Sequence, residues 1–395
     1  MTTPPDPPGP AAASEAAGRH ADASELERTR GQQRALARGS HTVTCSAPLG
    51  TGGLGRHFKE IADALAREGQ PANCISGADR ETASAPSGPL RPSVRERLRL
   101  PSEAALLAAL PVPVSPGLRT RAFMVDFDSF AARRLPRAEH LIAFNGQAIG
   151  QFGEARRAGY ETLALVSANS HLRRVLRQHE RAHRAYPLEG SWAAHLLRRN
   201  LAEYERADRV YVASRYTRES FLEQGYAEEK LATFPFTPDP RYRPATGAHA
   251  PASTFDIVYT GNLTVVKGVS LLIDAVARVR HDDIRLRLVG GWGSRGMRRF
   301  IERARARDPR ILVAAGDPLP VLHRARLYVH ASYEDGFGYA PAEALACGVP
   351  VLVSQDTGMK DLIDSPRRGL VLATGDLDAL VEAIDCAYRG ELFSS

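Results

Sequence analysis

Short apolar runs alternate along the chain with longer segments whose apolar residues recur at helical spacing. The runs predict strands in the first half at 42–47, 71–76, 121–125, 141–144, 162–167 and 209–213, and in the second at 255–260, 284–289, 311–314, 327–330 and 349–353. The longer segments predict helices at 55–68, 147–158, 172–181, 191–206, 269–280, 298–307, 341–346 and 377–388. Strands that alternate with helices are typical of parallel βαβ units.

A cluster of chain breakers divides this series in two. Pro238, Pro240, Pro244 and Gly247 lie within 235–251, which indicates an inter-domain linker. We therefore expect two Rossmann-like α/β domains, at residues 40–236 and 255–395, joined by a linker at 237–254. Residues 1–39, rich in Pro, Ala, Ser and Arg, are expected to form a disordered tail. A further loop is expected at 80–102. In doubly wound domains ligands bind at the carboxyl ends of the strands, here across an inter-domain cleft.

Composition and charge narrow the class of protein. The chain is 43% hydrophobic and 25% charged, which excludes global disorder, and its net charge of +7 comes from 48 arginines among 52 basic residues. A basic balance suits anionic partners such as nucleotide phosphates or an anionic membrane face. The four scattered cysteines form no CxxC pair and indicate a reducing compartment. Without an apolar run of about 18 residues, a cytoplasmic protein is expected.

A glycine-rich turn follows the first predicted strand. Gly50, Gly52 and Gly55 satisfy the pattern GxGxxG before a helix, where backbone amides and the helix N-terminus favour phosphate. A nicotinamide dinucleotide site would want an acidic residue at the end of the second strand, but Asp79 comes only after Gly77. An NAD(P)-dependent oxidoreductase, a site for another phosphate-bearing ligand and a merely tight turn therefore stand as alternatives.

The second half contains a loop and helix with two carboxylates, within residues 333–351. Gly336 and Gly338 can expose backbone N–H groups to sugar hydroxyls or phosphates. Asp335 on the loop and Glu343 on the helix can face one ligand from two directions as acceptors for sugar diols. The structural alternative is that Asp335 caps a turn and Glu343 complements the helix dipole.

This segment resembles the signature of retaining glycosyltransferases of family 4, which have the GT-B fold. The signature is an acidic residue, seven residues, a glutamate, a small-residue helix and a Gly-x-Pro-Val turn. Asp335 takes the first position, where the family usually has glutamate, and Glu334 is a weaker match because its spacing to Glu343 is one residue longer. The sequence from Gly261 to Lys267 is similar to the family's loop with a phosphate-binding lysine, although Asn262 stands where many members have arginine.

The resemblance implies a role for each of these residues. Gly52 and Gly53 would approach the diphosphate of a nucleoside-diphosphate sugar, and Lys267 would neutralise it and ease its departure. Gly261 and Asn262 would belong to the same donor site. The donor sugar would be held by Asp335 and the backbone of Phe337 and Gly338, and the nucleotide ribose by Glu343.

The family also tends to carry a histidine just after an amino-domain strand, near the reacting carbon. His171 is the best positional match, His57 and His140 are alternatives, and a purely structural role for His171 stays open. The implied reaction transfers the sugar to a glycan or lipid-linked acceptor with retention of anomeric configuration. The resemblance implies no metal, no other cofactor and no protein nucleophile, and nothing indicates nucleic-acid binding.

Some features leave alternatives open. GT-B enzymes commonly continue, after a helix such as 377–388, into a further helix that crosses back onto the amino domain, but this chain is short there. This short end and Asn262 also fit a catalytically inactive nucleotide-sugar-binding homologue. The triplets 126–128 and 376–378 have the form Asp-x-Asp, which holds a divalent metal in another transferase fold, although the second triplet also fits a helix start. Arginines on 172–184 and 196–206 form either a solvated face or a patch that docks on anionic lipid at the inner face of the plasma membrane.

Overall fold

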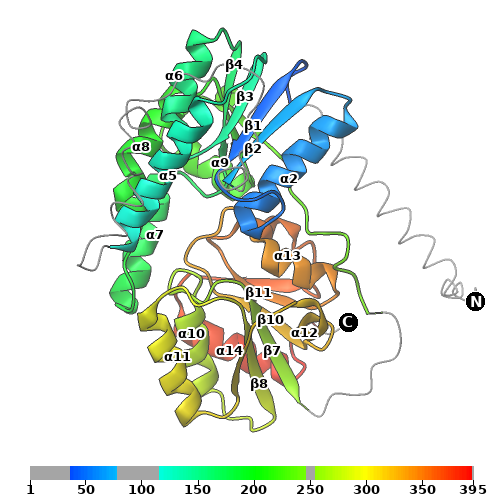
Figure 1. Ribbon diagram of the computed structural model, residues 1–395. Coiled ribbons are helices and arrows are strands. Elements are labelled where there is room, and N and C mark those ends of the chain that lie inside the picture. Colours follow the sequence, from blue (N-terminus) through cyan, green and yellow to red (C-terminus); the bar gives the residue numbers. More distant parts are fainter. Residues whose placement is uncertain (1–35, 78–114, 246–253, 394–395) are drawn as a thin grey trace, which may run out of the picture.

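The computed structural model describes residues 36–77, 115–245 and 254–393. The loop expected at 80–102 and most of the expected tail at 1–39 lie outside the described residues. Within them, the chain folds into two α/β domains, each built on one six-stranded parallel sheet (Figure 1).

The amino-domain sheet has the strand order β2-β1-β3-β4-β5-β6, and every neighbouring pair is parallel. Its central strands β1, β3 and β4 are buried on both faces, which explains the nearly continuous apolar sequences of β3 and β4. The strands are β1 (His41–Cys45), β2 (Ala72–Ser76), β3 (His140–Phe144), β4 (Thr162–Ser167), β5 (Arg209–Val212) and β6 (Leu231–Thr233).

Alternate strand residues pack against helices on opposite faces of this sheet. Val43 and Ile142 face Phe58 of α2, whereas Leu141 and Leu165 join the core beneath α6, α7 and α8. Figure 1 shows α2 on one side of the sheet and α5 to α8 on the other. The helices are α2 (Gly52–Arg67), α5 (Pro116–Ala132), α6 (Ile149–Arg157), α7 (Leu172–Ala185), α8 (Ala193–Arg206), α9 (Arg215–Leu222) and the 3-10 turn η2 (Glu228–Lys230).

The strand predicted at 121–125 is wrong, because these residues lie inside helix α5. Ser115 caps that helix by accepting a hydrogen bond from the N–H of Leu118 at 3.2 Å, and Pro116 occupies its first turn. The buried positions Ala122, Asp126 and Phe130 recur every four residues, which is a helical spacing. A five-residue apolar run has no periodicity that separates a strand from part of a helix, so the cap was the better signal.

The carboxyl-domain sheet has the order β12-β11-β10-β7-β8-β9 and is also entirely parallel. Its strands are β7 (Phe255–Thr260), β8 (Ile284–Val289), β9 (Ile311–Ala314), β10 (Leu327–His330), β11 (Val351–Ser354) and β12 (Gly369–Leu372). Its helical segments are α10 (Val269–Arg278), α11 (Arg295–Arg307), α12 (Leu319–Leu322), α13 (Tyr339–Ala346), η3 (Gly358–Leu362) and α14 (Leu377–Tyr388). The expected pair of doubly wound domains is confirmed. The edge strands β6 and β12 and helix α9 were not predicted, because each is short and has little apolar periodicity.

The two domains meet through buried polar contacts. The backbone oxygen of Gly336 accepts hydrogen bonds from Ser214 Oγ at 2.5 Å and Thr217 Oγ1 at 3.0 Å. On another side of the interface, Tyr186 donates to Asp274 Oδ2 at 2.7 Å. Such contacts fix how the two sheets face each other. Over the described ranges, no helix combines the length and apolar character needed to cross a membrane.

Candidate active site

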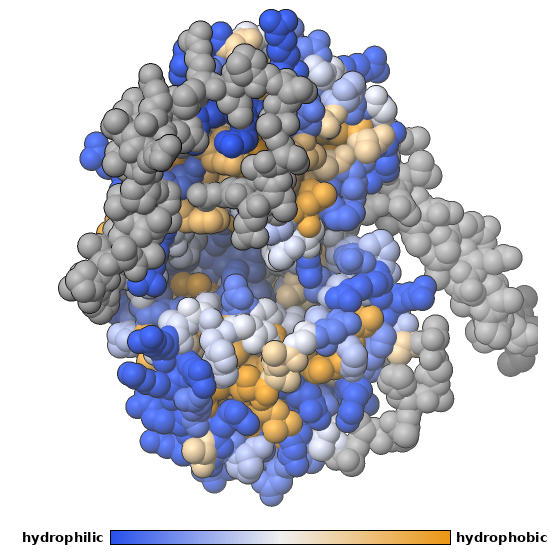
Figure 2. Space-filling view, in the orientation of Figure 1, coloured by the Kyte–Doolittle hydropathy of each residue, from blue (hydrophilic) through white to orange (hydrophobic). Residues whose placement is uncertain are grey.

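A cleft of about 570 Å³ lies between the domains, hollowed into the middle of the molecule in Figure 2. The loops that line it follow the carboxyl ends of strands in both sheets, where ligands bind in doubly wound folds. The chemically informative lining residues are Gly52, Gly53, Arg56, His57 and Asn169 from the amino domain, and Gly261, Asn262, Lys267, His330, Asp335, Gly338 and Glu343 from the carboxyl domain.

The amino-domain wall is the N-terminal turn of helix α2. Gly52 has a positive φ of 62°, which favours glycine. A Cβ added at Gly55 would lie 2.2 Å from the backbone oxygen of Pro48, so this position requires glycine. Gly52 and Gly53 of this turn line the cleft. Backbone N–H groups and the positive end of the helix dipole therefore lie at the cleft, an arrangement that favours phosphate.

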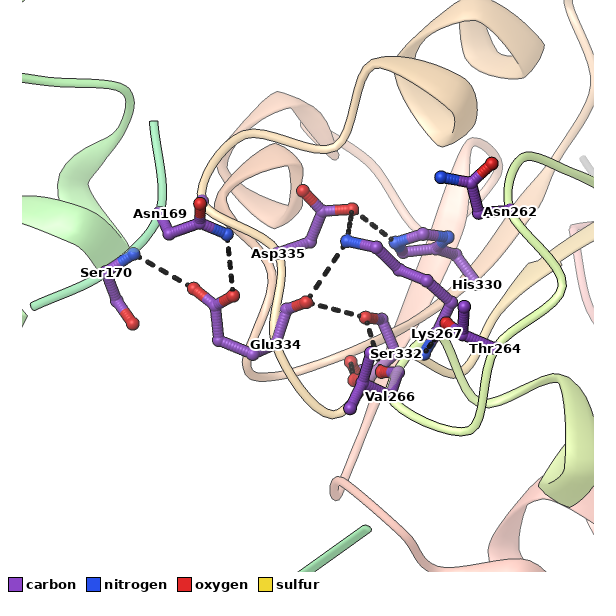
Figure 3. Close-up of polar contacts among 12 residues, drawn as sticks. Asn169, Ser170, Asn262, Thr264, Val266, Lys267, His330, Ser332, Glu334 and Asp335 are labelled. Carbon is purple, nitrogen blue, oxygen red and sulfur yellow. Dashed lines mark hydrogen bonds and ion pairs between the residues drawn. The ribbon is translucent and has the colours of Figure 1, made fainter. Parts of the chain in front are cut away.

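Lys267, Asp335 and His330 form a charged cluster on the opposite wall (Figure 3). Lys267 Nζ lies 2.8 Å from Asp335 Oδ2, and His330 Nε2 contacts the same oxygen at 3.0 Å. Burial by itself would raise the pKa of Asp335, but the Lys267 charge and the His330 contact outweigh it and hold that pKa well below its usual range. Asp335 is therefore a carboxylate at neutral pH.

The position of Lys267 depends on the glycine that follows it. Gly268 has a φ of 71° at the start of α10, and a Cβ there would lie 1.9 Å from the backbone oxygen of Ala331. Only glycine permits this close approach to the loop after β10. The Lys267 ammonium consequently reaches across to Asp335 and to the backbone oxygen of Glu334, at 3.3 Å.

Glu334 points away from this cluster and joins the two domains. Its carboxylate accepts hydrogen bonds from the N–H of Ser170 at 2.9 Å and from Nδ2 of Asn169 at 3.1 Å (Figure 3). Burial raises the pKa of Glu334, with Lys267 opposing that shift. Of the two neighbouring acids, Asp335 faces the cleft and Glu334 positions Asn169.

Glu343 lies in α13 and forms an ion pair with Arg56 of α2 across the cleft. Its side chain is 3% exposed. Burial raises the pKa of Glu343, and Arg56 counteracts part of that rise. Next to this pair, Tyr339 donates to Glu60 Oε1 at 2.7 Å and lies 3.5 Å from His57 Nδ1.

The structure does not bring His171 to the cleft, which corrects its expected catalytic position. His171 is fully buried, caps α7 by accepting from the N–H of Arg173 at 3.3 Å, and packs 4.9 Å from Tyr204 and 5.0 Å from Phe221. Burial lowers its pKa to about 4. His140 contacts the backbone oxygen of Arg38 and is likewise absent from the lining.

His57, the other alternative, does line the cleft. Burial lowers its pKa to about 3, although the negative charge of Asp335 opposes the shift, so its imidazole is neutral at pH 7.

The other sequence-predicted residues come together at the cleft with one exception. Phe337 packs its side chain into the core near Phe236 and Tyr339 instead of lining the cleft. Arg56, Asn169 and His330 were not predicted. Arg56 carried a detectable signal, since it lies three and four residues after Gly53 and Gly52 and so shares their helix face.

The Asp-x-Asp triplets have structural roles. Asp128 accepts hydrogen bonds from the N–H groups of Gly150 and Gln151 at the start of α6 and pairs with Arg199. Asp376 caps α14 by accepting from the N–H of Ala379 at 3.0 Å, as expected for a helix start. In the part of the chain that the structure describes, no group of three or more His, Cys, Asp or Glu side chains is arranged to hold a metal ion.

Residues 254–389 match the family model described as Glycosyl transferases group 1. Solved structures share the whole two-domain architecture. A sucrose-phosphate synthase from Thermosynechococcus elongatus is 19% identical with a TM-score of 0.63, over 89% of this chain and 90% of that one. WaaG, a glycosyltransferase involved in lipopolysaccharide biosynthesis, is 16% identical with a TM-score of 0.60, over 88% and 90%. The fold is GT-B.

Curated relatives of this GT-B protein match over shorter stretches. A D-inositol 3-phosphate glycosyltransferase of Arthrobacter sp. is 29% identical over 178 residues, and a capsular polysaccharide biosynthesis glycosyltransferase of Staphylococcus aureus is 25% identical over 143. The matches cover 40% and 35% of this chain, and 41% and 37% of those proteins. Residues 254–389 thus resemble a glycosyl transferases group 1 domain, and the chain spans less than half the length of these curated relatives.

Proposed function

We propose that this protein transfers a sugar from a nucleoside-diphosphate sugar to a glycan or lipid-linked acceptor, with retention of anomeric configuration. One observation carries the proposal: the glycine turn of α2, Lys267, Asp335 and Glu343 converge on one inter-domain cleft. In support, a GT-B neighbour from Anabaena, 15% identical with a TM-score of 0.55, was solved with UDP-glucose.

Each part of such a donor has a chemical counterpart in the cleft. The amides of Gly52 and Gly53 and the Lys267 ammonium suit the diphosphate, on which negative charge grows as the sugar leaves. Asp335 and the Gly338 backbone suit the donor sugar, and the Glu343 carboxylate suits the ribose hydroxyls. Gly261 and Asn262 complete the wall beside the diphosphate.

The proposed chemistry is a front-face displacement. The bond from the anomeric carbon to the diphosphate oxygen breaks, and the acceptor hydroxyl oxygen bonds to the same face of that carbon. The hydroxyl proton passes to the departing diphosphate, so no protein nucleophile is required. His57, neutral at pH 7, replaces His171 as the histidine positioned at this cleft.

We further propose that the reaction needs no metal and that the acceptor is reached from the cytoplasmic side, with peripheral contact to an anionic membrane. Exposed Arg173, Arg177 and Arg184 on α7 supply positive charge for that contact.

The decisive test is a thermal-shift screen against UDP-, GDP-, ADP- and dTDP-sugars, followed by hydrolysis and transfer assays with the stabilising donor and NMR of the product's anomeric centre. Stabilisation by one donor with an anomerically retained product would support the proposal. Donor binding without hydrolysis or transfer would favour a nucleotide-sugar-binding homologue that lacks turnover. Inversion at the anomeric carbon would contradict the retaining step.

A further inference from the structure

Arg56 and Glu343 form an ion pair that joins the two domains across the cleft. Arg56 Nη1 contacts Glu343 Oε1, and the guanidinium lies 5.4 Å from the centre of the Tyr339 ring. The Arg56 side chain is 32% exposed, so it keeps access to the cleft. Glu343 is the carboxylate assigned above to the ribose, and a nucleotide must therefore compete with Arg56 for it.

The charges of the cleft wall are balanced in this structure. Among the described residues that line the cleft, the positive charges belong to Arg56 and Lys267, and the negative charges belong to the carboxylates of Asp335 and Glu343. Each cation is paired with one carboxylate, so the permanent charges of the wall, +2 and −2, sum to zero. The two lining histidines do not alter this balance at pH 7, since burial lowers the pKa of His57 to about 3 and also lowers that of His330.

A nucleoside diphosphate matches this pattern by exchanging partners. Its ribose hydroxyls donate hydrogen bonds, as Glu343 requires, and its diphosphate accepts them, as a released Arg56 requires. Arg56 lies on the same face of α2 as Gly52 and Gly53, one turn from the helix end that favours phosphate. A guanidinium at that place can bind a phosphate through two parallel N–H groups.

We propose that Arg56 is the amino-domain residue that binds the donor diphosphate, and that the ribose displaces it from Glu343 as the nucleotide enters. This inference rests on the proposed function and deepens it by naming a second cation for the diphosphate. It also links recognition of the ribose by one domain to recognition of the diphosphate by the other. A nucleoside has no phosphate. Its ribose would break the Arg56–Glu343 pair without offering Arg56 a new anionic partner, so we expect a nucleoside to bind weakly.

Calorimetric titration of the wild type and three variants tests this exchange. UDP, GDP, ADP and dTDP are first titrated into the wild type to choose the nucleotide. That diphosphate and its parent nucleoside are then compared in the wild type, Arg56→Gln, Arg56→Lys and the control Lys59→Gln. Lys59 belongs to the same helix but is 54% exposed and pairs with Asp63 on the surface, and it does not line the cleft.

We expect Arg56→Gln to weaken diphosphate binding at least tenfold while nucleoside binding stays equal or becomes tighter. Arg56→Lys should fall between Arg56→Gln and the wild type, because it keeps the charge but loses the planar fork. The control should match the wild type for both ligands. Unchanged diphosphate binding in Arg56→Gln would overturn the inference. Equal weakening of both ligands would also overturn it, since Arg56 would then only orient Glu343. If no nucleotide bound the wild type, the proposed function itself would fail.

Discussion

Lys267 and Asp335 come from loops 68 residues apart in sequence, yet their charged atoms lie 2.8 Å apart on one wall of the cleft. The pair keeps Asp335 ionised and holds the ammonium where the proposed diphosphate would lie. A ligand bound at this wall would contact the Lys267 ammonium and, beside it, the Asp335 carboxylate as a hydrogen-bond acceptor.

Replacing Lys267 with alanine should weaken donor binding. A charge-assisted hydrogen bond is worth about 1.5–3 kcal/mol, so the dissociation constant should rise roughly tenfold to a hundredfold. Titration calorimetry with the donor measures the change. Lys230→Ala is the control, because Lys230 contacts the backbone oxygen of Glu205 away from the cleft. Equal donor affinity in both variants would remove Lys267 from the site.

His171→Asn should change how stability depends on pH, not turnover. Asparagine preserves the cap of α7. Burial lowers the pKa of His171 in the folded protein to about 4, from 6.5 in the unfolded chain. As pH falls below about 6.5, the unfolded chain therefore binds a proton that the folded protein does not, and the folded state loses stability. Between pH 7 and pH 5 this histidine should account for about 2 kcal/mol of that loss. Urea unfolding at both pH values should show a smaller difference in the variant. A large fall in turnover at unchanged stability would restore a catalytic role.

Gly336→Ala should disturb the domain interface. A Cβ at this position would lie 2.0 Å from the backbone oxygen of Ala168, so the two loops must move apart. We expect turnover to fall at least tenfold and unfolding free energy to drop by about 1–3 kcal/mol. Gly190→Ala is the matched control, since a Cβ there meets nothing within 4 Å. Normal kinetics in Gly336→Ala would show that catalysis tolerates a displaced loop.

Glu334→Gln should loosen the contact between the domains. The carboxylate accepts from two donors, whereas a glutamine amide would turn one N–H group toward one of them. A loss of about 1–3 kcal/mol is expected in calorimetric unfolding of the full chain. The exposed inter-domain pair Arg215–Asp361 supplies the control: Asp361→Asn should cost clearly less stability than Glu334→Gln, because water screens an exposed pair. Similar losses in both would show that burial of Glu334 is unimportant.

Chelation should leave transfer activity unchanged, because in the proposed site Lys267 and Arg56 supply the positive charge that a divalent ion provides in other transferases. The assay compares initial rates before and after incubation with EDTA. A loss of rate that added manganese restores would contradict a metal-independent site.

The sequence by itself determined the two-domain plan and many of the residues that line the cleft. Alternating apolar runs specify parallel βαβ units wherever a strand is buried on both faces, as in β3 and β4. Glycines at 52, 268 and 338 have a positive φ, a conformation that favours glycine. Of these, Gly268 directly follows Lys267, and Gly338 is the N-cap of the helix that carries Glu343. Local chemistry therefore sufficed where a residue's role depended on its immediate neighbours in the chain.

Tertiary structure alone decided which of several equivalent side chains reach the cleft. His57 and His171 each sit near the start of a helix, but α2 faces the other domain at its N-terminus, whereas the start of α7 is enclosed by Tyr204, Phe221 and Tyr226. Likewise, adjacent acids point in opposite directions, Asp335 to Lys267 and Glu334 to Asn169. Such choices depend on contacts between segments far apart in sequence, which a local pattern does not encode.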